Sequence, residues 1–147
     1  MAGSFSEWDK MGYAQKKGYE NEIEFAGYLD DIFKFDNFKF QRIGNAETNK
    51  MTLHGDVIID SRTDRDEKCF LRRYFLEAKC HAQPNLFDIL TESEKNAQKY
   101  SKHGSIAYIV KQKKGHKREG TIVAMSTETF RRICRELQGY INEENLT

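Results

Sequence analysis

The sequence predicts a single mixed α/β domain, with helices covering both faces of a central sheet. Stretches with apolar residues three and four positions apart lie near both ends of the chain and after Pro84, which is typical of helices. Short apolar or alternating runs between them are typical of strands. The expected element order is α-β-β-β-α-β-β-α, and 147 residues suffice for one domain (1–147) with its own hydrophobic core.

Residues 6–35 predict one long helix or two helices in line, because small or apolar residues recur at helical spacing from Trp8 to Phe33. Glu22 falls in this inward row, between Gly18 and Phe25. An unpaired acid there would be costly to bury. From periodicity alone, Glu22 is equally well explained as a residue at the edge of the row that reaches water.

Three strands are expected next, over residues 38–43, 53–60 and 73–80. In the third, alternation places Phe75, Glu77 and Lys79 on one face and the even-numbered residues from 74 to 80 on the other. Because both faces carry apolar residues, this strand is expected to be central and covered on both sides.

The second half of the chain predicts two helices and two strands. A helix over residues 88–103 is expected to stop at Gly104, and a buried strand follows over residues 105–111. A basic loop spans 112–119, and a further strand spans 120–125. Ser126 is expected to cap a final helix that Gly139 ends.

Composition constrains the function only loosely. The chain carries 24 Lys and Arg against 23 Asp and Glu, so overall charge neither indicates nor excludes a nucleic-acid partner. Three widely spaced cysteines favour free thiols in a reducing compartment, and their spacing does not suit zinc. No apolar run approaches the ~20 residues that span a bilayer, so a cytoplasmic protein without membrane contact is expected.

Charged residues in the second and third expected strands indicate chemistry. Asp56 and Glu77 are hard oxygen ligands of the kind that Mg²⁺ prefers, and the backbone carbonyl of Ala78 is a further candidate. Such an ion could activate water for phosphodiester hydrolysis, while Lys79 could favour ionisation of that water or neutralise developing charge. The alternative is an ion pair of Lys79 with Asp56 or Glu77 that serves only the fold. We favour a functional role, because three ionisable groups in apolar strands are expensive as pure structure.

These residues also carry a family resemblance. Gly55-Asp56-Val57-Ile58, followed after about twenty residues by Leu76-Glu77-Ala78-Lys79, resembles the PD-(D/E)XK nuclease superfamily, with Gly55 where the signature proline would stand. Within it the chain is most similar to the archaeal-type Holliday junction resolvases, over about residues 16 to 125. That similarity involves Lys17-Gly18 with Glu22, and Gln98 with Tyr100, Gly104 and the run 107–110.

The resemblance implies an αβββαβ restriction-endonuclease-like core and a Mg²⁺-dependent DNA endonuclease, with Mn²⁺ able to substitute. Glu22 would be an active-site acid, Asp56 and Glu77 metal ligands, Lys79 the catalytic lysine and Gln98 a polar residue beside the site. The implied substrate is branched or junction DNA, and the implied assembly is a homodimer. For Gln98, a solvated helix residue is an equal alternative.

Basic residues offer candidate DNA contacts, since each neutralised phosphate strengthens binding in a salt-dependent way. The densest run contains Lys111, Lys113, Lys114, Lys117 and Arg118; Lys16 and Lys17 could add contacts from the first helix. The run could equally be a solvated hairpin tip. Two other functions stay open: a restriction-like, nicking or repair nuclease of the same superfamily, and a non-catalytic DNA- or protein-binding module.

Overall fold

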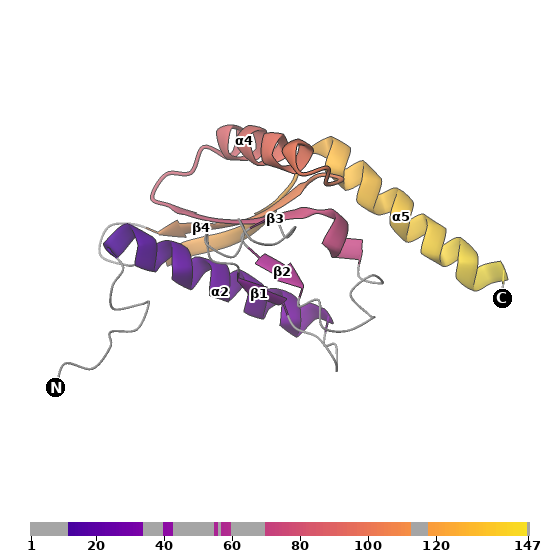
Figure 1. Cartoon of the computed structure of the whole chain (residues 1–147), viewed down its shortest axis with the longest axis horizontal. Coiled ribbons are helices and arrows are strands. Elements are labelled where there is room, and N and C mark those ends of the chain that lie inside the picture. The colour runs from indigo at the N-terminus through magenta and orange to yellow at the C-terminus, as the bar shows by residue number, and fades with distance from the viewer. Residues whose placement is uncertain are drawn as a thin grey trace.

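The protein is a mixed α/β structure in which helices lie on both faces of a three-stranded sheet (Figure 1). The computed structural model describes residues 12–33, 40–42, 55, 57–59, 70–112 and 118–146. Its elements are α2 (Tyr13–Phe33), β1 (Phe40–Arg42), β2 (Val57–Ile59), a 3-10 turn η2 (Phe70–Arg73), β3 (Phe75–His81), α4 (Leu86–Lys99), β4 (Ser105–Gln112), β5 (Arg118–Ala124) and α5 (Thr127–Leu146). The predicted class and order of helices and strands are confirmed for these residues, with η2 as an addition.

The main sheet has the strand order β3-β4-β5, with β3 parallel to β4 and β4 antiparallel to β5. β1 and β2 form a separate antiparallel pair. The expectation that residues 73–80 form the central strand is therefore wrong for the described ladders, since β4 lies between the other two strands. The run 105–110 is buried throughout, which is why β4 takes that place.

The core lies mainly between α2 and one face of the sheet. Phe25, Ala26 and Leu29 of α2 join Leu76 of β3 and Tyr108 of β4 in one buried cluster. Residues 78 and 80 pack against that cluster, so the predicted division of β3 into two faces is confirmed. The other face carries Phe75, which stacks on Tyr100 just after α4. Helices α2 and α4 thus cover opposite faces (Figure 1).

Local side chains set the start of both later helices. The Asn85 side chain accepts a hydrogen bond from the Asp88 amide, so α4 begins at Leu86 rather than at residue 88. It ends at Lys99, before Ser101 with φ of 55°, and the expected stop at Gly104 is wrong. The predicted cap of α5 is confirmed, because Ser126 Oγ accepts from the Thr129 amide.

Helix α5 continues through Gly139 to Leu146, so the expected end at Gly139 is also wrong. A glycine inside a helix costs only about 1 kcal/mol relative to alanine, and a Gln138–Asn142 side-chain hydrogen bond spans this position. Cys80 and Cys134 are free thiols. No helix among the described residues is long and apolar enough to cross a membrane.

Candidate active site

Glu77 and Lys79 lie side by side on the face of β3 that α4 covers. The Lys79 Nζ atom is 3.3 Å from Glu77 Oε1. The Glu77 side chain is only 8% exposed, whereas that of Lys79 is 36% exposed. The pair therefore joins a buried carboxylate to an ammonium group that still reaches solvent.

The second oxygen of Glu77 marks this carboxylate as unusual. Glu77 Oε2 is buried and has no hydrogen-bond partner within the described part of the chain. Glu136 also has one such oxygen, but its other oxygen contacts both Tyr74 Oη and His103 Nδ1. A buried carboxylate oxygen without a donor is costly. It is also the type of atom that a hard divalent cation binds, so Glu77 fits the metal-ligand role expected for it.

Gly55 brings the preceding strand segment close to Glu77. Its φ is +132°, and a Cβ atom built there would lie 3.3 Å from the Leu76 carbonyl oxygen. Proline, whose ring holds φ near −65°, cannot adopt this conformation. The backbone geometry therefore explains why glycine stands at this position. Asp56 itself lies outside the described residues, so its position relative to Glu77 stays a prediction.

Glu22 and Gln98 are not brought to the Glu77–Lys79 pair by any contact among the described residues. Glu22 lies on α2, which covers the opposite face of the sheet, and its Oε2 atom is 2.8 Å from Arg42 Nε of β1. Gln98 is exposed on α4 and lines a hollow with Glu94, Met125 and Ser126. Neither position tests the role expected from the resemblance, and both roles stay predictions.

The described ends of the basic run are paired with acids of the same chain. Lys111 Nζ is 2.9 Å from Glu119 Oε2, and Arg118 forms a two-pronged ion pair with Glu24 of α2. The hydrogen bond from Arg118 holds the pKa of Glu24 below its ordinary value of 4.5, and a bond from Tyr108 Oη lowers it further. These contacts fasten β5 and β4 to α2.

The remaining basic candidates are less fully described. Lys113, Lys114 and Lys117 lie outside the described residues, as does the side chain of Lys17. Lys16 lies half-exposed on the first turn of α2. The expected DNA surface around residues 111–118 therefore stays a prediction.

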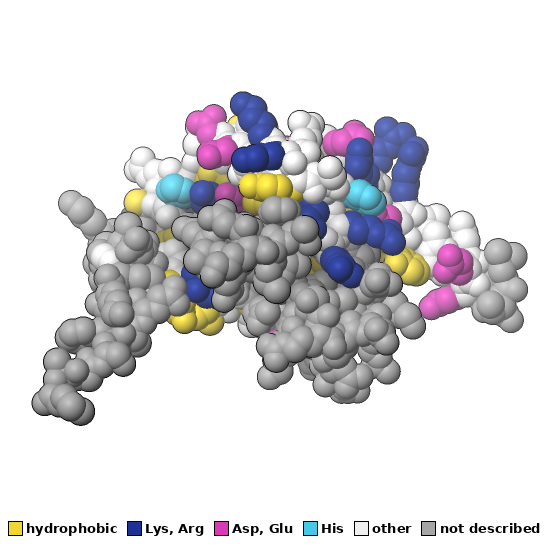
Figure 2. Space-filling model, viewed as in Figure 1, with side chains coloured by type: hydrophobic (Ala, Val, Ile, Leu, Met, Phe, Trp, Pro, Cys, Tyr) yellow, Lys and Arg dark blue, Asp and Glu magenta, His cyan; other side chains and the backbone are white. Residues whose placement is uncertain are grey.

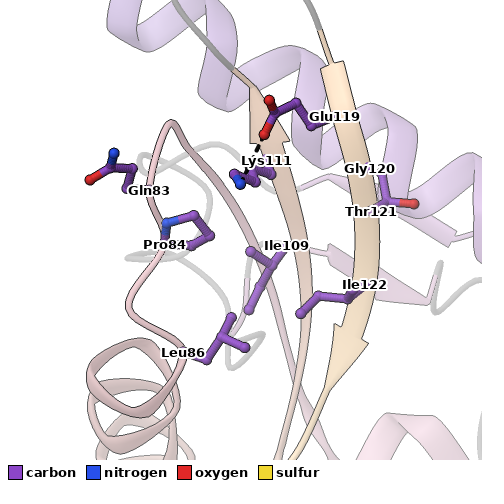
Figure 3. A pocket seen from close by; sticks show the side chains of 9 residues that line it. All are labelled: Gln83, Pro84, Leu86, Ile109, Lys111, Glu119, Gly120, Thr121 and Ile122. Atoms are coloured by element: carbon purple, nitrogen blue, oxygen red, sulfur yellow. Dashed lines mark ion pairs between the residues drawn. The ribbon is translucent and has the colours of Figure 1, made fainter.

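A pocket of about 580 Å³ lies over β4 and β5, and neither Glu77 nor Lys79 lines it (Figure 3). Ile109, the register neighbour of Lys79, forms part of its floor with Ile122 and Leu86. The Lys111–Glu119 ion pair lies at one end of the pocket. No motif indicated this pocket, because its wall is assembled from β4, β5 and the connection between β3 and α4.

A polar network that the sequence did not indicate holds α4 against β4 and α5. Glu94 Oε1 accepts hydrogen bonds from the Ser105 amide, from Ser126 Oγ and from Thr129 Oγ1. The Ser126-x-x-Thr129 spacing signals the helix cap, but nothing local pairs it with an acid more than thirty residues earlier. The network is structural and fixes the helix that covers Glu77.

Neither the metal-ligating side chains that the structure describes nor the comparisons with known proteins assign a function to this site. No cluster of three or more His, Cys, Asp or Glu residues suited to a metal ion is present among the described residues, which do not include Asp56. The chain matches no protein-family model, and comparison with curated proteins and with solved structures gives no significant match.

Proposed function

We propose that this chain is a Mg²⁺-dependent DNA endonuclease with an αβββαβ restriction-endonuclease-like core, and that it acts on branched or junction DNA. The observation that carries the proposal is the buried Glu77 carboxylate, with one oxygen beside Lys79 and the other without a described donor. The close approach of Gly55 to the backbone of Leu76 adds support, because Asp56 directly follows Gly55 and Glu77 directly follows Leu76.

Asp56 and Glu77 would hold the cation, with the Ala78 carbonyl as a further ligand. The bound ion would supply a polarised phosphate and a water of lowered pKa. Lys79 extends from the same face as Glu77 and would place its ammonium group against a phosphate oxygen, where negative charge develops during cleavage. Burial of Glu77 keeps its carboxylate fixed and away from water.

The substrate class is the finer part of the proposal and rests on the resemblance to the junction resolvases. Because such a substrate presents two symmetric strands, two copies of the chain would act together. Glu22 and Gln98 would contribute from α2 and α4. Cleavage of a four-way junction, compared with matched linear duplex, flap and single-stranded DNA, distinguishes a resolvase from a restriction-like or repair nuclease.

The second candidate is a non-catalytic binding module, in which Glu77 and Lys79 form only a structural ion pair. The 3.3 Å contact between them favours this candidate, as do the acid-paired residues Lys111 and Arg118. The two candidates differ in metal binding. Calorimetry with Mg²⁺ and Mn²⁺ should give binding that Glu77→Gln abolishes; absence of binding by the parent chain would favour the module.

Cleavage assays test the catalytic proposal. Asp56→Asn, Glu77→Gln and Lys79→Ala should each lower the metal-dependent rate by about 10²–10⁴-fold, the range typical of removing a catalytic group. Glu92→Gln, which changes an exposed acid on α4, is the matched control and should cut as the parent does. Circular dichroism shows whether each variant is folded.

A further inference from the structure

Basic side chains gather where η2, the connection between α4 and β4, and the first half of α5 meet. They form the η2–α5 patch, which consists of Arg72, Arg73, Lys102, His103 and Arg132. The His103 amide donates to the Arg73 carbonyl oxygen at 2.7 Å. Lys102 Nζ donates to the Arg72 carbonyl oxygen at 2.9 Å. These contacts hold η2 against the connection, so bases that are distant in the sequence lie together.

Helix α5 joins the patch through Glu136. Its Oε1 atom is 3.1 Å from both Tyr74 Oη and His103 Nδ1. Burial raises the pKa of Tyr74 to about 12, and the guanidinium groups of Arg132 and Arg73 act in the opposite direction. Both groups therefore lie near enough to the Tyr74 hydroxyl to influence it, one from α5 and the other from η2.

The cations of the patch have no described counter-charge apart from Glu136. Arg72, Arg73, Lys102 and Arg132 form no ion pair with an acid among the residues that the structure describes. Burial lowers the pKa of Lys102, and the neighbouring Arg72 lowers it further. Because like charges gathered in one place repel one another, stability alone does not account for this arrangement. A bound anion would offset the repulsion.

The patch differs in this respect from the basic run around residues 111–118. The described ends of that run, Lys111 and Arg118, are paired with acids of the same chain. A paired base must leave its acid before it can neutralise a phosphate. An exposed guanidinium group without an acid can bind a phosphate directly, through two parallel hydrogen bonds. Arg72, Arg73 and Arg132 are exposed and meet this condition.

The position of the patch on α5 favours a nucleic acid over a membrane surface. Figure 2 shows Lys and Arg side chains gathered over the start of this helix. The exposed apolar residues Phe130 and Leu137 lie about 140–160° round the helix from Arg132, at about 100° per residue. A membrane that took up those apolar side chains would leave Arg132 on the side facing water. A polyanion with a row of phosphates needs no apolar contact and fits the patch better.

We propose that the η2–α5 patch binds the phosphate backbone of DNA. The identity of the polyanion rests on the proposed nuclease function, but the surface does not require Glu77 to be catalytic. Arg73 precedes Glu77 by four residues, so their Cα atoms are at most about 15 Å apart. One turn of B-DNA is longer, at roughly 34–36 Å. A duplex bound to the patch is therefore long enough to extend to Glu77.

Fluorescence anisotropy with a labelled linear duplex and a labelled four-way junction in EDTA tests the surface without cleavage. The parent chain should bind both, more weakly as salt rises. Arg73→Gln and Arg132→Gln should each weaken binding about 10-fold at ~0.1 M salt and reduce the slope of log affinity against log salt by about 0.9, the value for one phosphate contact. Lys95→Gln removes the same charge from an exposed position on α4 and should bind as the parent does.

The outcomes separate this surface from the catalytic assignment, because binding in EDTA does not depend on the metal. A parent chain that binds neither DNA would overturn the proposal. So would Arg73→Gln and Arg132→Gln variants that circular dichroism shows to be folded and that bind with the affinity and salt dependence of the parent. An equal loss in Lys95→Gln would show attraction to overall charge and also contradict the proposed surface. Binding to phosphatidylserine vesicles but not to DNA would identify a lipid surface instead and would overturn the proposal as well.

Discussion

Replacing Gly104 with alanine should destabilise the fold strongly, although its backbone conformation suits any residue. A Cβ atom there would lie 2.1 Å from Thr129 Oγ1 and 3.0 Å from two Thr129 carbons. Thr129 is 1% exposed, and its hydroxyl donates to Glu94 Oε1 at 2.7 Å. Overpacking costs about 1–3 kcal/mol, and loss of a hydrogen bond to a carboxylate about 1.5–3 kcal/mol. We expect a total loss of roughly 3–5 kcal/mol in the free energy of unfolding.

Urea denaturation of a double-mutant cycle measures this effect. Thr129→Ala removes the Oγ1 and Cγ2 atoms that the new methyl group would meet and leaves only the Cβ atom of residue 129, at 3.0 Å, so Gly104→Ala should cost no more than about 1 kcal/mol in that background. The coupling energy between the two sites should then be at least about 2 kcal/mol. Additive losses would refute the reasoning, because they would show that Thr129 does not limit the space at Gly104.

Three further predictions concern single side chains. Glu77→Leu should raise the midpoint of thermal unfolding measured in EDTA. The substitution removes a buried carboxylate oxygen without a described donor and leaves Lys79 in contact with water. A lower midpoint would indicate that the Glu77–Lys79 ion pair stabilises the fold. Glu24→Gln should lower the unfolding free energy at pH 7 by about 1 kcal/mol or less. Because the Arg118 hydrogen bond lowers the pKa of Glu24, this contribution is present above pH 4.5 and disappears as the pH falls through the lowered pKa, so the two denaturation curves should converge in acid. Gly55→Pro should lower the chemical denaturation midpoint by the equivalent of about 2 kcal/mol or more, because φ of +132° is closed to proline; an unchanged midpoint would contradict this.

The order of elements could be predicted because each strand and helix carries its own periodicity. Ser126 as a cap and the two faces of β3 follow from local rules, and the structure confirms both. The central position of β4 could not be predicted, because strand order depends on pairing between distant segments. Gly139 was misleading because a single glycine lowers helix stability by less than the neighbouring turns of α5 add to it.

The candidate site was predictable only in part. Glu77 and Lys79 alternate on one strand, so their shared face follows from the sequence alone. The partners of Glu22, Lys111 and Arg118 are acids or bases on other elements, which local periodicity does not specify. The pocket floor at Ile109 and the Glu94 network likewise arise from tertiary packing.

Metal-dependent DNA cleavage by the Glu77→Gln variant is the most direct test of the proposed function. The rate of junction cleavage in Mg²⁺ is compared for the parent, Glu77→Gln and the Glu92→Gln control, with all three folded. We predict that the parent and the control cleave, and that Glu77→Gln loses about 10²-fold or more. Equal cleavage by Glu77→Gln, or none by the parent in Mg²⁺ and Mn²⁺, would contradict the assignment of this carboxylate to the active site.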